Sequence, residues 1–157
     1  MLVATQDELA VSCWLDPEPV QVARAREQAR KTLPSWGLGE HVDLTELIVS
    51  ELVTNAMIHG RGRIEVRVSC AACGDLWVEV RDEGAGRPVR HRPGTDDERG
   101  RGLELIDGLI ELCGGARGFV DNSNGPGKTV YVAVPLGSSP SDLLLHGRGG
   151  AMKPGRP

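Results

Sequence analysis

The sequence predicts an α+β fold: a two-layer sandwich in which a mixed, mostly antiparallel sheet carries helices on one face. Two observations favour this architecture. Residues 63–70 and 76–82 alternate apolar and charged side chains on either side of a short turn, which is typical of an antiparallel hairpin with one buried face. Residues 43–59 and 102–113 instead repeat apolar side chains at helical spacing, so two helices are expected to pack against that face.

The chain begins with a predicted strand and a predicted helix. Residues 9–15 are apolar at alternate positions, and Asp16 and Pro17 end this run. Residues 20–33 are rich in Ala, Arg, Gln and Glu, which are good helix formers, and Pro34 is expected to end the helix.

The second predicted helix contains two polar residues at unexpected positions. Asp43, with Glu46 three residues later, is similar to a capping box and predicts where the helix starts, and Gly60 predicts where it ends. Glu51 and Asn55 lie about one turn apart on a stripe that should face the core. A carboxylate and an amide are unfavourable there unless a polar group meets them, so the pair indicates a site.

The second half of the chain alternates glycine-rich segments with short elements. Residues 83–101 have no apolar periodicity, and a structureless stretch of this length inside a domain is usually functional or disordered. Strands are expected at 119–120 and 129–136. The Gly-, Ser- and Pro-containing segment 137–157 is expected to be a disordered tail, so the folded domain is predicted to span residues 1–136.

Composition and charge exclude several classes of protein. The 157 residues carry a formal net charge of −4 and only one Phe, one Tyr and three Trp, which argues against direct nucleic-acid binding through charge or stacking. No apolar run is long enough for a membrane span, and no basic segment opens the chain, so a cytoplasmic protein with no membrane contact and with reduced cysteines is expected. Cys70 and Cys73 have the spacing of a redox or zinc motif, but neither a following helix nor a second Cys/His pair supports one.

Three glycine-containing segments are candidates for the groups that meet Glu51 and Asn55. They are Asp82-Glu83-Gly84-Ala85-Gly86 after a strand, Gly100-Arg101-Gly102 before a helix, and Gly127-Lys128-Thr129 before a strand. Asp82 can accept a hydrogen bond from an exocyclic amine, and neighbouring glycines let a flat ring approach the backbone. Amides at a helix start bind phosphate, to which Arg101 could add charge-assisted bonds. Turns and hinges are the ordinary alternatives, and neither the dinucleotide fingerprint nor the P-loop fits the spacing.

Taken together, the order and spacing of these elements resemble the GHKL ATPases, whose Bergerat fold is shared by gyrase B and the sensor histidine kinases. The resemblance covers residues of about 9–136. The matching segments are Glu51-x-x-x-Asn55 with His59 for the N box, Asp82-x-Gly84-x-Gly86 for the G1 box, Gly100-Arg101-Gly102-Leu103 for the G2 box, and Gly127-Lys128-Thr129 for the last box. The first and third segments are especially similar to small bacterial anti-sigma-factor serine/threonine kinases.

The resemblance implies a site for ATP and Mg²⁺. Asn55 would bind Mg²⁺ that bridges the phosphates, and Glu51 would be the catalytic base that accepts the proton of a substrate hydroxyl. Asp82 would hold the adenine amino group, with Thr129 assisting through its hydroxyl. The remaining nucleotide-binding residues that the resemblance implies are Gly84 and Gly86 beside the ring and Gly100, Arg101, Gly102 and Leu103 at the phosphates. The role of His59 stays open between local hydrogen bonding and catalysis.

At the level of function, the resemblance implies a serine/threonine protein kinase that acts as an anti-sigma factor. Its partners would be a sigma factor and an anti-sigma antagonist of the STAS type, and it would form a homodimer. Two alternatives remain open: a module that binds ATP without transferring phosphate, and a detached catalytic domain of a histidine kinase.

Overall fold

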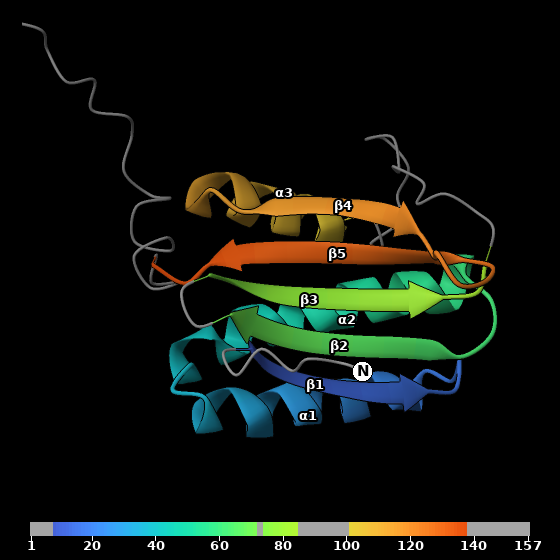
Figure 1. The fold of residues 1–157 in the computed structure, drawn as a ribbon, viewed down its shortest axis with the longest axis horizontal. Helices are drawn as coiled ribbons and strands as arrows, with labels where there is room; N and C mark the ends of the chain where they lie inside the picture. The colour runs from blue at the N-terminus through green and yellow to red at the C-terminus, as the bar shows by residue number, and fades with distance from the viewer. Residues whose placement is uncertain (1–7, 72–73, 85–100, 138–157) are drawn as a thin grey trace, which may run out of the picture.

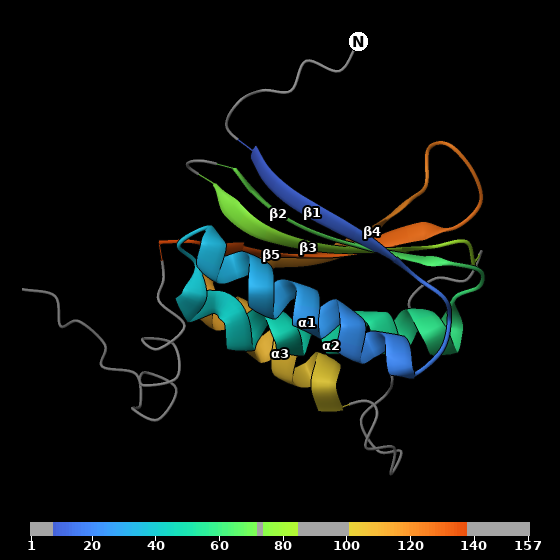
Figure 2. The same cartoon turned by 90° about the horizontal axis from the view of Figure 1, so that it is seen from below.

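The computed structural model describes residues 8–71, 74–84 and 101–137, which form a five-stranded sheet covered on one face by three helices (Figures 1 and 2). The predicted two-layer α+β arrangement is therefore confirmed. Five sequence predictions lie wholly or mostly outside the described residues: the second cysteine of the Cys70–Cys73 pair, the segment 83–101, of which residues 85–100 are not described, Gly86 and Gly100 at or within that segment, and the tail from residue 138 onward.

The elements follow one another in the predicted order. The bounds are β1 (Glu8–Leu15), α1 (Val20–Ser35), the short 3₁₀ helix η1 (Gly39–His41), α2 (Val42–His59), β2 (Ile64–Ala71), β3 (Asp75–Asp82), α3 (Arg101–Cys113), β4 (Ala116–Asp121) and β5 (Lys128–Pro135).

The sheet has the strand order β1-β2-β3-β5-β4, and each neighbouring pair is antiparallel (Figure 1). The prediction of a mixed sheet was wrong in this respect, because none of the five described strands pairs in parallel. The return from β4 to β5 through a tight turn inserts β5 between β3 and β4. As a result, the carboxyl end of β3 lies beside the amino end of β5, with Asp82 opposite Lys128.

Two predicted helix ends differ from the structure. Pro34 lies inside the last turn of α1 rather than ending it, because a proline removes only its own N–H, and the carbonyls of Leu33 and Pro34 still accept hydrogen bonds from residues 36–38. Asp43 is not the cap of α2. The helix starts at Val42 directly from η1, its cap position makes no side-chain hydrogen bond, and Glu46 instead forms an ion pair with Arg30 of α1.

The core lies between the sheet and α2, which runs between α1 and α3 (Figure 2). Its largest fully buried side chains are aliphatic, as the scarcity of aromatic residues predicts. Each of these side chains stabilises the fold by about 1.5–3 kcal/mol relative to exposure. They are Leu15, Leu33, Ile48, Ile64, Leu76, Ile106, Val49, Val53, Val78, Val80, Val132 and Val134.

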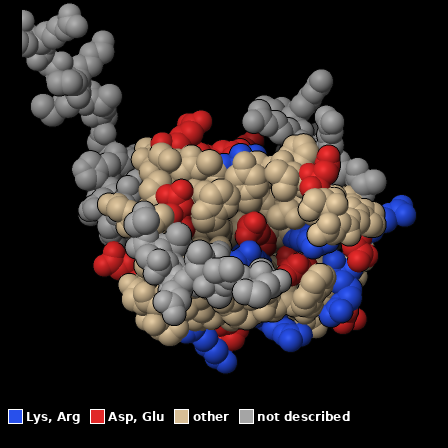
Figure 3. Space-filling view, in the orientation of Figure 1, with Lys and Arg blue, Asp and Glu red and all other residues tan. Residues whose placement is uncertain are grey.

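The other face of the sheet is covered by no described helix and carries charges of both signs (Figure 3). Glu65 lies opposite Arg81, and Arg67 lies opposite Glu79, so opposite charges are paired across β2 and β3. Trp77 and Tyr131 meet on the same face with ring centroids 5.4 Å apart. In the described part of the chain, no helix combines the length and apolar character needed to cross a membrane.

Candidate functional site

A pocket between α2, β3, β5 and α3 brings together side chains from all the predicted segments that the structure describes. Apolar side chains form most of its walls, and polar groups from α2, β3, β4 and β5 enter it. Such a combination is typical of small-molecule sites. The lining residues are Leu52, Asn55, Ala56, His59, Val80, Asp82, Leu103, Arg117, Lys128 and Val130.

Glu51 meets the start of α3. The side chain is half-buried on α2, and a methyl group built on Gly102 would overlap all three atoms of its carboxyl group. Burial raises the pKa of Glu51 above its usual value. Glu51 therefore takes up a proton more readily than an exposed glutamate, which suits a proton acceptor. A side chain at residue 102 would force this carboxyl group to move.

Asp82 is the most constrained polar residue of the pocket. Its side chain is 1% exposed, and the backbone N–H of Gly84 donates to Oδ1 at 2.7 Å. Two glycines hold the carboxylate closely: a Cβ at Gly60 would lie 2.6 Å from Asp82 Cγ, and one at Gly84 would lie 2.9 Å from Oδ1. Gly60 follows α2 as predicted, but in an extended conformation, so close approach to Asp82 is what requires glycine there.

Lys128 is a residue of this site that the sequence analysis did not single out. The residue is 5% exposed, and Nζ lies 3.2 Å from Asp82 Oδ2 and 3.4 Å from Oδ1. One signal could have identified it: in β5, Lys128 shares its face with the apolar side chains of Val130, Val132 and Val134. A lysine in an apolar alternation needs a buried acidic partner.

Thr129, by the same alternation, belongs to the opposite face of β5 and is not among the pocket-lining residues. Its hydroxyl donates to Oδ1 of Asn122 at 2.8 Å. Asn122 Nδ2 in turn donates to the carbonyl oxygens of Asp82 and Pro126, both at 3.1 Å. The threonine therefore supports the end of β3 through Asn122. The side chain that lies beside the Asp82 carboxylate is that of Lys128.

The glycine of the last predicted segment has a clear structural role. Gly127 has a φ of +102°, which favours glycine, and any side chain there would overlap the carbonyl oxygen of Asp82. The β4–β5 turn thus rests on the backbone of residue 82, and this contact requires both the positive φ and the missing side chain.

The remaining predicted residues are placed as follows. Asn55 lines the pocket one turn after Glu51, with Leu103 across it on α3. Arg101 is the first residue of α3, so the helix begins at the predicted glycine-containing segment. Among the described residues, no group of three or more metal-ligating side chains occurs. Asn55 offers one oxygen of the kind that Mg²⁺ accepts beside substrate phosphates, so the residues fit a metal held jointly by protein and phosphate.

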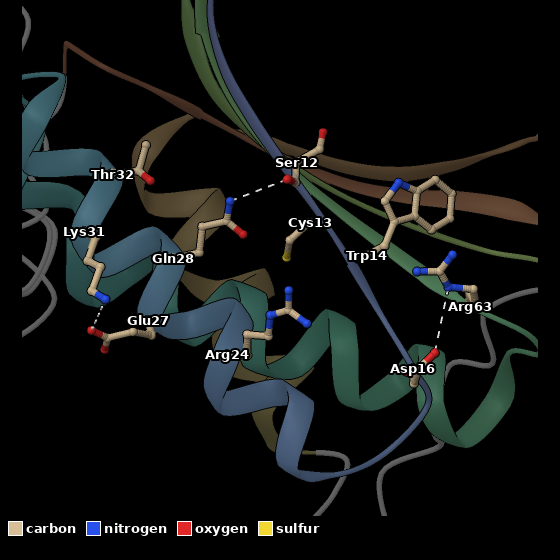
Figure 4. A pocket seen from close by; sticks show the side chains of 10 residues that line it. All are labelled: Ser12, Cys13, Trp14, Asp16, Arg24, Glu27, Gln28, Lys31, Thr32 and Arg63. Atoms are coloured by element: carbon tan, nitrogen blue, oxygen red, sulfur yellow. Dashed lines mark hydrogen bonds and ion pairs between the residues drawn. The ribbon is translucent and has the colours of Figure 1, made fainter.

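A second hollow, between β1 and α1, contains none of the predicted site residues (Figure 4). Its charged groups are largely engaged with one another: Lys31 lies 3.5 Å from Glu27, and Arg63 lies 3.8 Å from Asp16. Burial raises the pKa of the Cys13 thiol, which disfavours the reactive thiolate. Cys70 is buried in β2, and Cys73, the second residue of the pair whose spacing was considered above, lies outside the described residues.

Comparison with known proteins matches residues 15–133 to the family described as "Histidine kinase-like ATPase domain". Among solved structures, the chain is similar to the histidine kinase domain of a blue-light activated histidine kinase from Erythrobacter litoralis, with a TM-score of 0.50 and 20% sequence identity. The match covers 83% of this chain but 64% of that one, so the chain spans less than two thirds of its neighbour. At this identity, the likeness shows a shared fold alone. No curated protein matches the sequence.

Proposed function

The chain belongs to the family of histidine kinase-like ATPase domains, an ATP-binding module of the GHKL type, and we propose on this basis that it is a serine/threonine protein kinase acting as an anti-sigma factor. In this proposal, the γ-phosphoryl group of ATP passes to a hydroxyl group of an anti-sigma antagonist of the STAS type. The protein would also sequester a sigma factor. These finer assignments rest on the resemblance of the Glu51–Asn55 and Gly100–Leu103 segments to small anti-sigma-factor kinases.

The observation that carries the proposal is the position of Glu51. Its carboxyl group is packed against Gly102 at the amino end of α3, where backbone amides favour phosphate. A second negative charge at such a place opposes phosphate binding, so a module that only binds nucleotide gains nothing from it. A carboxylate whose pKa is raised by burial is, however, well suited to accept the proton of an attacking hydroxyl.

The other pocket residues support binding and orientation. Asp82 would accept a hydrogen bond from the adenine amino group, and the close approach of Gly60 and Gly84 would hold its carboxylate in place for that contact. Asn55 would hold Mg²⁺, which neutralises phosphate charge when bound. Phosphoryl transfer requires mainly positioning and electrostatics from the protein, so one base and one metal ligand can suffice.

Regulation would follow from the charge that the transfer adds. A phosphate on the antagonist disrupts an interface by repulsion and desolvation, and the freed kinase would then hold the sigma factor. We propose a homodimer as the form that binds these partners and the cytoplasm as its location, both on the resemblance alone.

A transfer assay with labelled ATP and Mg²⁺ tests the proposal directly. Wild type, Glu51→Ala and Glu111→Ala, an exposed glutamate of α3, are incubated with candidate antagonists from the same genome. We expect acid-stable label on a serine or threonine with wild type and Glu111→Ala, and none with Glu51→Ala. Acid-labile label on a histidine would favour a detached histidine-kinase domain. ATP binding without transfer to a complete set of candidates would favour a pure binding module.

A further inference from the structure

Lys128 has no role in the proposed function, yet it is the buried cation of the pocket. The residue is 5% exposed at the start of β5, and both Asp82 oxygens lie within 3.4 Å of Nζ. Removing such a group from water is unfavourable, and an apolar side chain of similar size would often serve stability as well. A role in recognition would explain why a lysine stands there.

The hydrogen-bonding capacity of the pair is incompletely used. An ammonium has three donors, and among the described residues the two Asp82 oxygens are the acceptors that Lys128 Nζ meets. The carboxylate of Asp82 can accept about four hydrogen bonds. The backbone N–H of Gly84 and the ammonium group of Lys128 occupy some of these acceptor positions. Within the part of the chain that the structure describes, the pair therefore has an ammonium donor and a carboxylate acceptor position left over.

The surroundings indicate that this donor faces a base rather than phosphates. Five apolar side chains share the pocket lining with the pair, and they suit the faces of a flat ring: Leu52, Ala56, Val80, Leu103 and Val130. The rest of the lining is polar and consists of Asn55, His59 and Arg117. The phosphate-binding candidate, the start of α3, is instead the place where Gly102 meets Glu51. An adenine edge presents an amino donor next to the acceptor N1, which is the complement of a carboxylate next to an ammonium.

We propose that Lys128 determines nucleotide specificity by donating a hydrogen bond to N1 of adenine while Asp82 accepts one from the neighbouring amino group. This inference rests on the proposed binding of ATP at the pocket. It adds a direct protein donor to the base and makes Lys128 a binding residue, with no part in the transfer step.

Equilibrium binding of ATP and 1-deaza-ATP, in which a C–H group replaces N1, tests the inference. We expect wild type to prefer ATP by about ten- to a hundred-fold, the value of one hydrogen bond to a charged group. Lys128→Met should bind both nucleotides equally, whereas Lys128→Gln, which keeps an N–H donor, should retain a preference. Lys31→Met, at an exposed lysine of α1, is the control and should behave as wild type.

The outcomes separate the inference from the proposed function. Equal binding of the two nucleotides by wild type, or an undiminished preference in Lys128→Met, would overturn the role of Lys128 while leaving ATP binding intact. Failure of wild type to bind ATP at all would overturn both. If Lys128→Met does not fold, the wild-type comparison and Lys128→Gln still decide the question.

Discussion

Replacing Gly60 with alanine should destabilise the protein, because the end of α2 passes directly against the pocket carboxylate. The new Cβ would lie 2.6 Å from Asp82 Cγ and 2.8 Å from Oδ1, and it would also overlap the carbonyl oxygen of Ala56. Comfortable carbon contacts need about 3.5–4.0 Å, so one of these groups must move by roughly 1 Å. Asp82 cannot move freely, since the N–H of Gly84 and Lys128 both hold its carboxylate.

The size of the effect follows from two opposing contributions. Overpacking of a well-filled site destabilises by about 1–3 kcal/mol. Alanine does not strain the backbone at residue 60, because Gly60 has a φ of −91°. Alanine also restricts the unfolded chain more than glycine does, and this effect stabilises the folded state by about 0.4–1 kcal/mol. The free energy of unfolding should therefore fall by up to about 2.5 kcal/mol, with about 1.3 kcal/mol at the middle of the range.

Urea unfolding of Gly60→Ala beside Gly108→Ala provides the measurement. Gly108 lies in α3, and no atom lies within 4 Å of the position that an added methyl group would take, so alanine there should stabilise by about 0.5–1 kcal/mol. Nucleotide affinity should fall with Gly60→Ala only, because Asp82 is displaced. Equal stability of Gly60→Ala and wild type, or the same change in both variants, would refute the packing argument.

Three further predictions concern Glu51 and His41. Gly102→Ala should displace the Glu51 carboxyl group, which is the far end of a flexible side chain. The rate of phosphoryl transfer should then fall at least tenfold, while the unfolding midpoint should change little. A normal transfer rate would contradict this prediction. Because burial raises the pKa of Glu51 from 4.5, its ionisation reduces stability as the pH rises through the folded-state value. Glu51→Gln should therefore be more stable than wild type at neutral pH and lose this advantage below about pH 4.5, which unfolding across that range would show. Burial lowers the pKa of His41 from 6.5, so stability should fall as the pH drops below that value, and His41→Leu should remove this slope in the same titration.

Much of the architecture could be predicted from local patterns. The period-two alternation of β2 and β3 and the helical spacing in α2 and α3 each report which face is buried, so the elements were assigned correctly. Of the two polar residues that stand against the apolar pattern of α2, Asn55 lines the pocket, whereas Glu51 meets Gly102 at the start of α3. The start of α2 was assigned wrongly because a preceding 3₁₀ turn replaces the side-chain cap, and a 3₁₀ turn leaves no periodic signal.

The pairing of Asp82 with Lys128 could not be deduced from spacing alone. The two residues are separated by 46 positions, and they meet only because β5 lies between β3 and β4. Strand order is a property of tertiary packing, which a single sequence does not display. Asp82 could therefore be predicted as a site residue, whereas its partner Lys128 was missed.

The turn between β4 and β5 contacts the backbone of Asp82. Changes in this turn can therefore alter the Asp82 end of the pocket although the turn residues do not contact a ligand. Asn122 holds the carbonyl groups of Asp82 and Pro126, and Gly127 rests on the backbone of residue 82. A substitution of Asn122 or Gly127 in this turn would be transmitted to the Asp82 backbone. Evolution or engineering could thus adjust how tightly the pocket binds by editing a solvent-facing loop while every lining residue stays the same.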